Sequence, residues 1–259
     1  MQTEAQTARI IRDVQSSTAR ISLHNPPLNV IDFAMMDELA QAISDIEARP
    51  EISMIVIRGE GKSFSAGVDV AAHTSDKVEA MLSNFHAVIR ALVSARKVTV
   101  AAVHGNCLGG GAELAMVCDL VYTTDDAQWG FPEIKLGCYP PVAVTALAAL
   151  VGQKRAADLI LTGRTISGSE AASMGLANRD VPTDGLDRVV EEALTHLSKL
   201  SPEALAITKK AIYAWDSIHF DKGLARSGRI YLEELMKTED TQEGINAFLE
   251  KREPQWKRK

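Results

Sequence analysis

The sequence has few of the features that would place a protein in a class at once. Its three cysteines, Cys107, Cys118 and Cys138, are odd in number and lack C-x-x-C spacing, which favours free thiols over a disulfide framework or a zinc site. No stretch of about eighteen uninterrupted apolar residues occurs, so no membrane-spanning helix is predicted. Residues 1–12 are polar and lack the apolar centre of a signal peptide. We therefore expect a cytoplasmic protein with no membrane partner.

An excess of basic residues is also missing. The chain has 28 Lys and Arg against 34 Asp and Glu, a net charge of −6, whereas general nucleic-acid binders normally carry a basic excess. With 259 residues, 46% of them hydrophobic, the chain is long enough to bury a sizeable core. The composition predicts an ordinary globular protein that does not bind nucleic acid.

Apolar spacing predicts an α/β chain. Residues 8–15 and 18–23 are typical of a hairpin of two strands, and Asp32 is placed to cap a helix. Residues 53–58 form an apolar strand after that helix, so the order predicts a right-handed parallel crossover. A second helix and strand follow, and further helical spacing covers residues 144–155, with Gly152 ending its regular part.

Long helical patterns replace this alternation from about residue 185. They cover residues 186–200, 202–215, 224–236 and 241–251. We therefore divide the chain into a core of residues 1–184 and a helical region of residues 185–259.

Two small-residue loops follow successive strands and carry the first functional signal. Residues 63–69 follow one strand, and the three glycines 109–111 follow the next and lead into a helix. The first N–H groups of a helix are unpaired and suit a developing oxyanion. If the two strands are parallel neighbours, the Val68 N–H and one N–H of the triple glycine can face the same point. The pattern predicts an oxyanion hole with Glu113 beside it.

A second carboxylate follows in the chain. Pro132 disfavours helix for Phe131, so Glu133 is expected at a loop end or in a short bridge near the same side of the sheet. Taken alone, each glutamate also fits an ordinary first-turn acid or a solvated loop charge.

Two other enzyme and ligand classes fit less well. Ser63 and Ser65 lack a G-x-S-x-G elbow, which disfavours a serine hydrolase, although other protease geometries stay open. The triple glycine is followed by Ala112-Glu113 rather than Gly-Lys-Ser/Thr, and a carboxylate there would repel phosphate, so a phosphate-binding loop is not predicted.

Together, these motifs resemble those of the crotonase (enoyl-CoA hydratase/isomerase) superfamily. The matching segments are residues 65–69 (Ser-Ala-Gly-Val-Asp), 104–115 (His-Gly-Asn-Cys-Leu-Gly-Gly-Gly-Ala-Glu-Leu-Ala) and 131–137 (Phe-Pro-Glu-Ile-Lys-Leu-Gly). The resemblance implies the crotonase (ClpP-like) α/β fold, with repeated strand-strand-helix turns and C-terminal helices used in assembly. It also implies trimers, commonly paired into hexamers, and an acyl-CoA substrate, without a separate cofactor or metal.

The resemblance also assigns roles to residues. It implies that the amides of Val68 and Gly110 hold the thioester oxygen, and that Glu113 and Glu133 are the two carboxylates that hydratases use on one water. Many isomerases, hydrolases and decarboxylases of the superfamily lack one or both carboxylates. Their joint presence favours hydration, in which one carboxylate takes a proton from water while a proton is delivered to carbon.

Further substrate contacts are expected at positions that match the family or depart from it. They are Ala66, Asp69, Val70, Ala71, Gly109, Trp129, Phe131, Tyr139, Phe248 and Lys251. Ala71 stands where some members carry a lysine near the nucleotide, so Lys251 and Arg252 are the candidates for phosphate contact, with solvated charge as the alternative. The aromatic residues fit core packing as well as a substrate wall, and Asp69 fits a loop cap better than a chemical role.

The segments 68–73, 140–141 and 231–236 are most similar to hydratases of cyclohexa-1,5-diene-1-carbonyl-CoA in anaerobic aromatic degradation. This similarity implies 6-hydroxycyclohex-1-ene-1-carbonyl-CoA as the product. Alternative interpretations are a general enoyl-CoA hydratase of fatty-acid β-oxidation, an enoyl-CoA isomerase and an RNA-binding member of the family; the acidic balance opposes the last.

Overall fold

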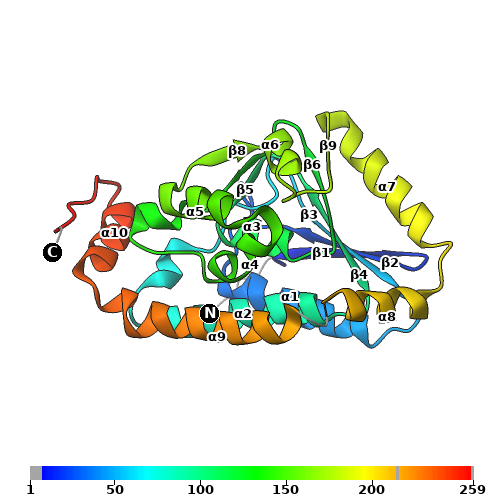
Figure 1. Cartoon of the computed structure of the whole chain (residues 1–259), viewed down its shortest axis with the longest axis horizontal. Coiled ribbons are helices and arrows are strands. Elements are labelled where there is room, and N and C mark those ends of the chain that lie inside the picture. Colours follow the sequence, from blue (N-terminus) through cyan, green and yellow to red (C-terminus); the bar gives the residue numbers. More distant parts are fainter. Residues whose placement is uncertain (1–7, 214–215, 258–259) are drawn as a thin grey trace, which may run out of the picture.

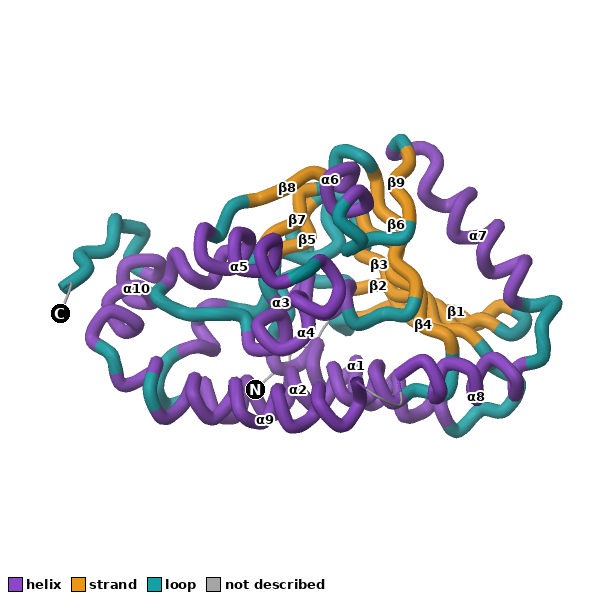
Figure 2. The backbone as a smooth tube through the Cα atoms, in the orientation of Figure 1, coloured by secondary structure: helices purple, strands orange, loops and turns teal. Residues whose placement is uncertain are grey.

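The fold is built on a six-stranded sheet with the strand order β1-β2-β3-β4-β6-β9 (Figures 1 and 2). A computed structural model describes residues 8–213 and 216–257. The strands are β1 (Ile10–Gln15), β2 (Thr18–Leu23), β3 (Met54–Gly59), β4 (Val98–Val103), β6 (Leu120–Thr124) and β9 (Arg179–Val181). β1 and β2 form the expected antiparallel hairpin, and the other neighbours pair in parallel, which confirms the predicted crossover.

Both faces of this sheet are covered, which explains why its central strands are apolar at nearly every position. On β3, Ile55 and Ile57 pack in the larger core, which includes the buried stripes of α1 (Phe33–Glu47) and α2 (Val78–Ser94). The alternate residues of β3 pack in a second core with α7 (Leu186–Leu197). Figure 1 shows α7 on one side of the sheet and α1 and α2 on the other.

A second sheet of three short strands stands beside the first. It has the order β5-β7-β8, with β5 (Asn106–Leu108), β7 (Gln128–Gly130) and β8 (Thr165–Ser167). The chain therefore places one strand in each sheet before a helix: β4 and β5 precede α3 (Gly110–Met116), and β6 and β7 precede η2 (Pro132–Leu136) and α4 (Pro141–Val151). This repeat agrees with the strand-strand-helix turns that the resemblance implies.

Capping and apolar spacing predicted the start of α1 correctly, but not the division of the expected helix 144–155 into two helices. Asp32 caps α1 by accepting a hydrogen bond from the Met35 amide at 2.8 Å. The expected helix 144–155 is instead two helices, α4 and α5 (Gln153–Thr162), because Gly152 lies between them with φ 84°. α6 (Gly168–Ser173) is short and capped by Ser167, and η1 (Val70–His73) is a further short helical turn.

The helices after residue 185 pack back onto the core. They are α7, α8 (Pro202–Tyr213), α9 (Asp216–Glu233) and α10 (Glu239–Leu249), with the short turns η3 (Thr183–Gly185) and η4 (Leu235–Lys237). α9 begins earlier than the expected residue 224, and residues 214–215 of the expected helix 202–215 lie outside the described residues. α9 runs beside α2 and α4, while α10 contacts η1 and η2 (Figure 1). Among the described helices, none is long and apolar enough to cross a membrane.

A buried ion pair fixes α8 to the sheet. Lys209 Nζ lies 2.7 Å from Asp119 Oδ2, and their side chains are only 7% and 13% exposed. Asp119 also accepts from the Thr99 amide. We expect Lys209→Met to lower the free energy of unfolding by about 3–5 kcal/mol, because Asp119 then remains buried without its cation. Urea unfolding measures this loss, and an equal loss in the exposed Lys210→Met control would contradict it.

Candidate active site

A hydrogen-bonded loop places the first amide of the site. Ser65 Oγ donates to the Asn29 carbonyl at 2.7 Å and accepts from the Gly67 amide at 3.1 Å, so it holds the turn that precedes Val68. A Cβ on Gly111 would lie 2.8 Å from the Ser65 carbonyl oxygen, so only glycine lets α3 pack this close to the loop. The small residues of the two loops therefore allow the backbone of one loop to lie close to that of the other.

The backbone amides of Val68 and Gly110, which were predicted to form the oxyanion hole, lie side by side. A Cβ built on Gly110 would be 3.3 Å from the Val68 nitrogen, which shows how near the two backbones come. Within residues 8–213 and 216–257, neither the Val68 nor the Gly110 N–H donates a hydrogen bond. Two free neighbouring donors are the arrangement that an oxyanion requires.

Glu113 is fixed by the helix opposite its own. It lies in the first turn of α3 and is 3% exposed. Its Oε1 accepts hydrogen bonds from the amides of Val142 at 2.8 Å and Ala143 at 2.9 Å, in the first turn of α4. One carboxyl oxygen is thus held by the backbone, and these two bonds leave Oε2 as the oxygen available for chemistry.

Glu133 projects from η2 toward the glycine turn. A Cβ on Gly109, where φ is +52°, would lie 2.7 Å from Glu133 Oε1, so this turn leaves room for the carboxyl group. Glu133 Oε2 is shielded from solvent and has no hydrogen-bond partner among the described residues. A buried acceptor without a partner indicates that a ligand or water completes the site.

The four groups meet at one cavity. Val68, Gly110, Glu113 and Glu133 all line a cavity of about 460 Å³. Burial raises the pKa of Glu113 above the usual carboxyl range, although its two backbone hydrogen bonds oppose the rise. Burial also raises the pKa of Glu133, and the charge of Glu113 raises it further. Near neutral pH the pair therefore favours holding one proton between two carboxyl groups.

The raised pKa values make stability depend on pH. Above about pH 4.3 the unfolded chain has released the Glu133 proton while the folded protein still holds it, so the free energy of unfolding falls as pH rises. Glu133→Gln removes the part of this dependence that comes from Glu133. We expect the variant to gain stability over the parent between pH 5 and pH 8, by about 1.4 kcal/mol for each unit of pKa shift. Thermal unfolding at the two pH values measures the gain, and a constant difference would contradict it.

The structure brings half of the other expected contacts to the cavity. Ala66, Val70, Gly109, Tyr139 and Phe248 line it. Asp69 and Ala71 do not, because the Asp69 side chain accepts from the Ala71 amide at 3.0 Å and caps η1. This is the loop-capping role that the sequence favoured for Asp69.

Three expected contacts lie elsewhere. Trp129 and Phe131 are fully buried, and Trp129 Nε1 donates to Thr123 Oγ1 at 3.0 Å, so both rings pack in the core between the sheets. Lys251 is not part of the cavity lining, whereas its neighbour Arg252 is. The Arg252 guanidinium forms ion pairs with Glu243 and Glu250.

Sequence reasoning missed several residues that line the cavity. α2 contributes Met81, Leu82 and Phe85, and α9 contributes Tyr231, which is 1% exposed and whose hydroxyl finds no partner among the described residues. Their apolar spacing was visible as a helix pattern. Nothing in that spacing distinguishes a side chain that packs in the core from one that faces a ligand.

Known proteins were compared with the chain as a whole. The sequence profile of the Enoyl-CoA hydratase/isomerase family matches residues 13–259. A probable enoyl-CoA hydratase of Mycobacterium tuberculosis is 37% identical, with 91% of this chain and 93% of that protein covered. The crystal structure of an enoyl-CoA hydratase from Mycobacterium avium subsp. paratuberculosis superposes with a TM-score of 0.87 at 26% identity, covering 96% of this chain and 98% of that one.

The comparisons do not favour hydratases of cyclohexa-1,5-diene-1-carbonyl-CoA over other enoyl-CoA hydratases. The cyclohexa-1,5-dienecarbonyl-CoA hydratase of Thauera aromatica is 34% identical, with 93% of each chain covered, below the 37% of the mycobacterial relative. These identities do not separate a cyclic from a linear acyl group. At the level that the profile and the relatives share, the chain belongs to the enoyl-CoA hydratase/isomerase family.

Proposed function

We propose that this protein, a hydro-lyase of the enoyl-CoA hydratase type, adds water across the α,β double bond of a linear 2-enoyl-CoA thioester. One observation carries the proposal: two carboxyl groups and two free amides line the same cavity of about 460 Å³. Probable enoyl-CoA hydratases at 37% and 34% identity support the choice of a general enoyl-CoA. The dienoyl-CoA suggested by the sequence becomes the second candidate.

The geometry suggests a role for each group. The Val68 and Gly110 N–H groups bind the thioester oxygen and stabilise the enolate that forms there. Glu113 keeps its negative charge more readily, because two amides donate to its Oε1, and it takes a proton from water. Glu133 Oε2 has no hydrogen-bond partner among the described residues, and burial and the Glu113 charge both raise the pKa of this carboxyl group, so it holds the proton that it gives to the α-carbon.

These steps balance. The water oxygen bonds to the β-carbon, the π electrons move to the thioester oxygen, and the enolate then takes the Glu133 proton at its α-carbon. The pair leaves the reaction with Glu113 protonated and Glu133 ionised, and transfer of one proton between them restores the starting state. Each atom comes from water, substrate or these two side chains.

The cyclic dienoyl-CoA remains a second candidate because of one relative. The Thauera aromatica hydratase that carries this substrate in its name covers 93% of this chain at 34% identity. Water would add at the β-carbon of the ring, with protonation at the far end of the extended dienolate. The same two carboxyl groups would serve both substrates.

A panel of thioesters decides between the candidates. We expect crotonyl-CoA to turn over faster than cyclohexa-1,5-diene-1-carbonyl-CoA, with kcat/KM measured from the loss of enoyl absorbance for the first and from the loss of dienoyl absorbance for the second. A much faster reaction of the cyclic diene would reverse this order. Reaction in ¹⁸O-labelled water separates hydration from isomerisation, since an isomerase moves the double bond without incorporating solvent oxygen.

We also propose that the protein assembles as a trimer or a dimer of trimers through its C-terminal helical region, residues 185–259. On α8, Ile207 and Ile212 are 59% and 65% exposed, and burying these apolar side chains against another chain would favour assembly. Light scattering of the purified protein measures its mass. Three or six chains per particle are expected, and a monomer would contradict the assembly.

The three cysteines are buried free thiols, consistent with the expected cytoplasmic location.

A further inference from the structure

Two tyrosine rings lie side by side in the wall of the cavity of about 460 Å³ that holds the carboxyl groups, which we call the acyl cavity. Tyr139 and Tyr231 both line it, and their ring centroids are 5.2 Å apart at an interplanar angle of 73°. The Tyr139 hydroxyl donates to the Ser227 carbonyl at 2.6 Å, so this ring is held at both ends. An edge-to-face pair that is also hydrogen-bonded to the backbone resists displacement by a ligand.

One end of the cavity is its mouth. Phe248 is 54% exposed, whereas Tyr231 is 1% exposed, so the cavity opens beside α10 and its buried end lies at Tyr231. Tyr139, which is partly exposed, packs edge to face against Tyr231 at this end. A thioester bound by Val68 and Gly110, with its reacting carbons at Glu113 and Glu133, lies between these ends. Its acyl chain therefore extends toward the tyrosines, because the CoA portion needs the mouth.

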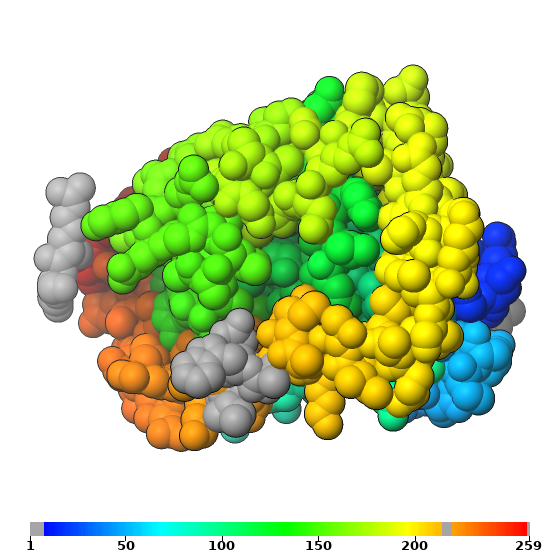
Figure 3. All heavy atoms as spheres, turned by 45° about the vertical axis from the view of Figure 1, so that its right-hand side comes forward, coloured from blue at the N-terminus to red at the C-terminus, as the bar shows by residue number. Residues whose placement is uncertain are grey.

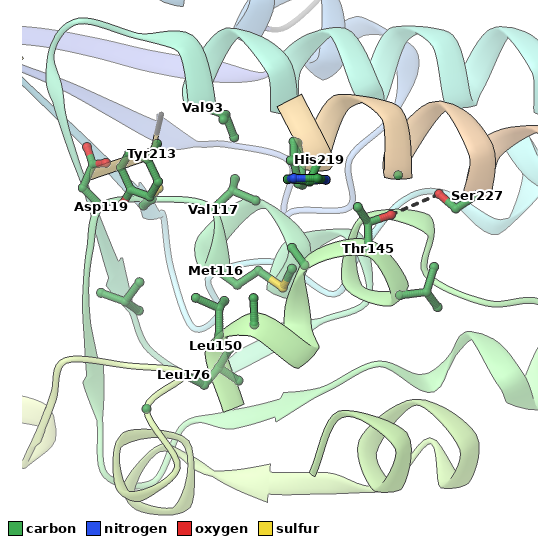
Figure 4. Close-up of a pocket in the computed structure, with 18 of the residues that line it drawn as sticks. Val93, Met116, Val117, Asp119, Thr145, Leu150, Leu176, Tyr213, His219 and Ser227 are labelled. Atoms are coloured by element: carbon green, nitrogen blue, oxygen red, sulfur yellow. Dashed lines mark hydrogen bonds between the residues drawn. The ribbon is translucent and has the colours of Figure 1, made fainter. Parts of the chain in front are cut away.

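A second cavity lies behind this wall. It has a volume of about 660 Å³ and is lined by residues of α4 and α9, including Val144, Thr145 and Ser227. Figure 4 shows apolar side chains along much of its wall, with Met116, Val117, Leu150 and Leu176 labelled. The polar side chains of Asp119, Tyr213 and His219 also line it, and the Thr145–Ser227 hydrogen bond lies at one edge. Figure 3 shows a recess on this face, between the yellow and orange helices and the green segment.

One layer of residues separates the two cavities. Ser227 lines the second cavity, while its carbonyl binds Tyr139 of the first. Its hydroxyl donates to the carbonyl of Pro141, which lines the first cavity, at 3.1 Å. On α9 the neighbouring positions Ile230 and Tyr231 line the second and the first cavity, respectively. The Tyr139 ring therefore lines the first cavity, while its hydroxyl contacts a residue that lines the second.

We propose that the Tyr139–Tyr231 pair determines the longest acyl chain that this enzyme accepts, by separating its acyl cavity from the second apolar cavity. The inference rests on the proposed function and adds the substrate class: short 2-enoyl-CoA thioesters. Long chains are rejected because a terminal methylene that meets a fixed ring gains no burial and must displace it.

The test compares acyl lengths within each variant. For the parent protein we expect kcat/KM to fall by about tenfold or more from crotonyl-CoA to 2-dodecenoyl-CoA. Tyr139→Ala opens the wall and should raise the ratio of long-chain to short-chain kcat/KM by about tenfold or more. The matched control Tyr139→Phe keeps the ring and should keep the parent ratio. A second change, Val144→Trp, partly fills the second cavity and should remove the gain in Tyr139→Ala.

Several results would overturn the proposal. They are a parent ratio near one, an unchanged ratio in folded Tyr139→Ala, or a gain that survives Val144→Trp. If Tyr139→Ala does not fold by circular dichroism, Tyr139→Leu is measured in the same way. Affinities for the unreactive butyryl-CoA and dodecanoyl-CoA, from calorimetry, test the wall without turnover. A parent protein that binds butyryl-CoA more tightly but hydrates nothing would refute the proposed function and leave the wall intact.

Discussion

Glu133→Gln lowers kcat for hydration by about 10²–10⁴-fold, and Glu113→Gln does the same. Glutamine keeps the size and hydrogen-bonding oxygen of each side chain but can neither take a proton from water nor give one to carbon. At position 113 the amide oxygen can still accept from Val142 and Ala143, so the local structure should survive. KM should change little, because neither carboxyl group anchors the CoA portion.

Steady-state kinetics with crotonyl-CoA measure the loss. Glu79→Gln is a matched control, since Glu79 is an exposed carboxylate on α2 and should keep the parent kcat. The double variant Glu113→Gln/Glu133→Gln should lose less than the product of the two single losses, because the groups act on the same water. Near-parent turnover in either single variant would show that its carboxyl group is not needed.

The second large effect is expected at the oxyanion hole. In Gly110→Ala the new Cβ would lie 2.6 Å from Val68 Cγ2 and 3.3 Å from the Val68 nitrogen. The methyl group would push the two amides apart and occupy the space for the thioester oxygen. We expect kcat to fall by about 10²–10³-fold, the usual effect of losing one such donor.

A second glycine serves as the control for Gly110→Ala. Gly228 lies in α9, and a Cβ there would meet His86 Cε1 at 3.4 Å, an ordinary contact. Gly228→Ala should therefore keep the parent kcat. If both variants lost activity equally, the effect at Gly110 would reflect general disturbance of packing rather than the loss of amide donors.

Much of the fold could be predicted because its signals are local. Asp32 caps α1 as its position suggested, and Met35, Leu39 and Ile43 form one buried stripe at helical spacing. β9 was not predicted, because this short strand joins the sheet through pairing with β6, far away in the sequence. Its three residues carry no apolar alternation, so only tertiary structure reveals it.

The candidate site was predictable where short motifs carry it. Glu113 follows closely on the glycine turn and Glu133 directly on Pro132, so both could be named. Tyr231 could not, because α9 brings it to Tyr139 from a distant part of the chain. Trp129, which the sequence placed at the substrate, is fully buried and hydrogen-bonded to Thr123 and is not among the residues that line the cavity.

The product formed from crotonyl-CoA in ¹⁸O-labelled water shows directly whether the two carboxyl groups hydrate the thioester. We predict that the parent protein yields 3-hydroxybutyryl-CoA with one labelled oxygen on the β-carbon, and that Glu113→Gln/Glu133→Gln yields no product above the uncatalysed background. An unlabelled product with a shifted double bond, or labelled product from the double variant at the parent rate, would contradict the claim that the two carboxyl groups hydrate one thioester.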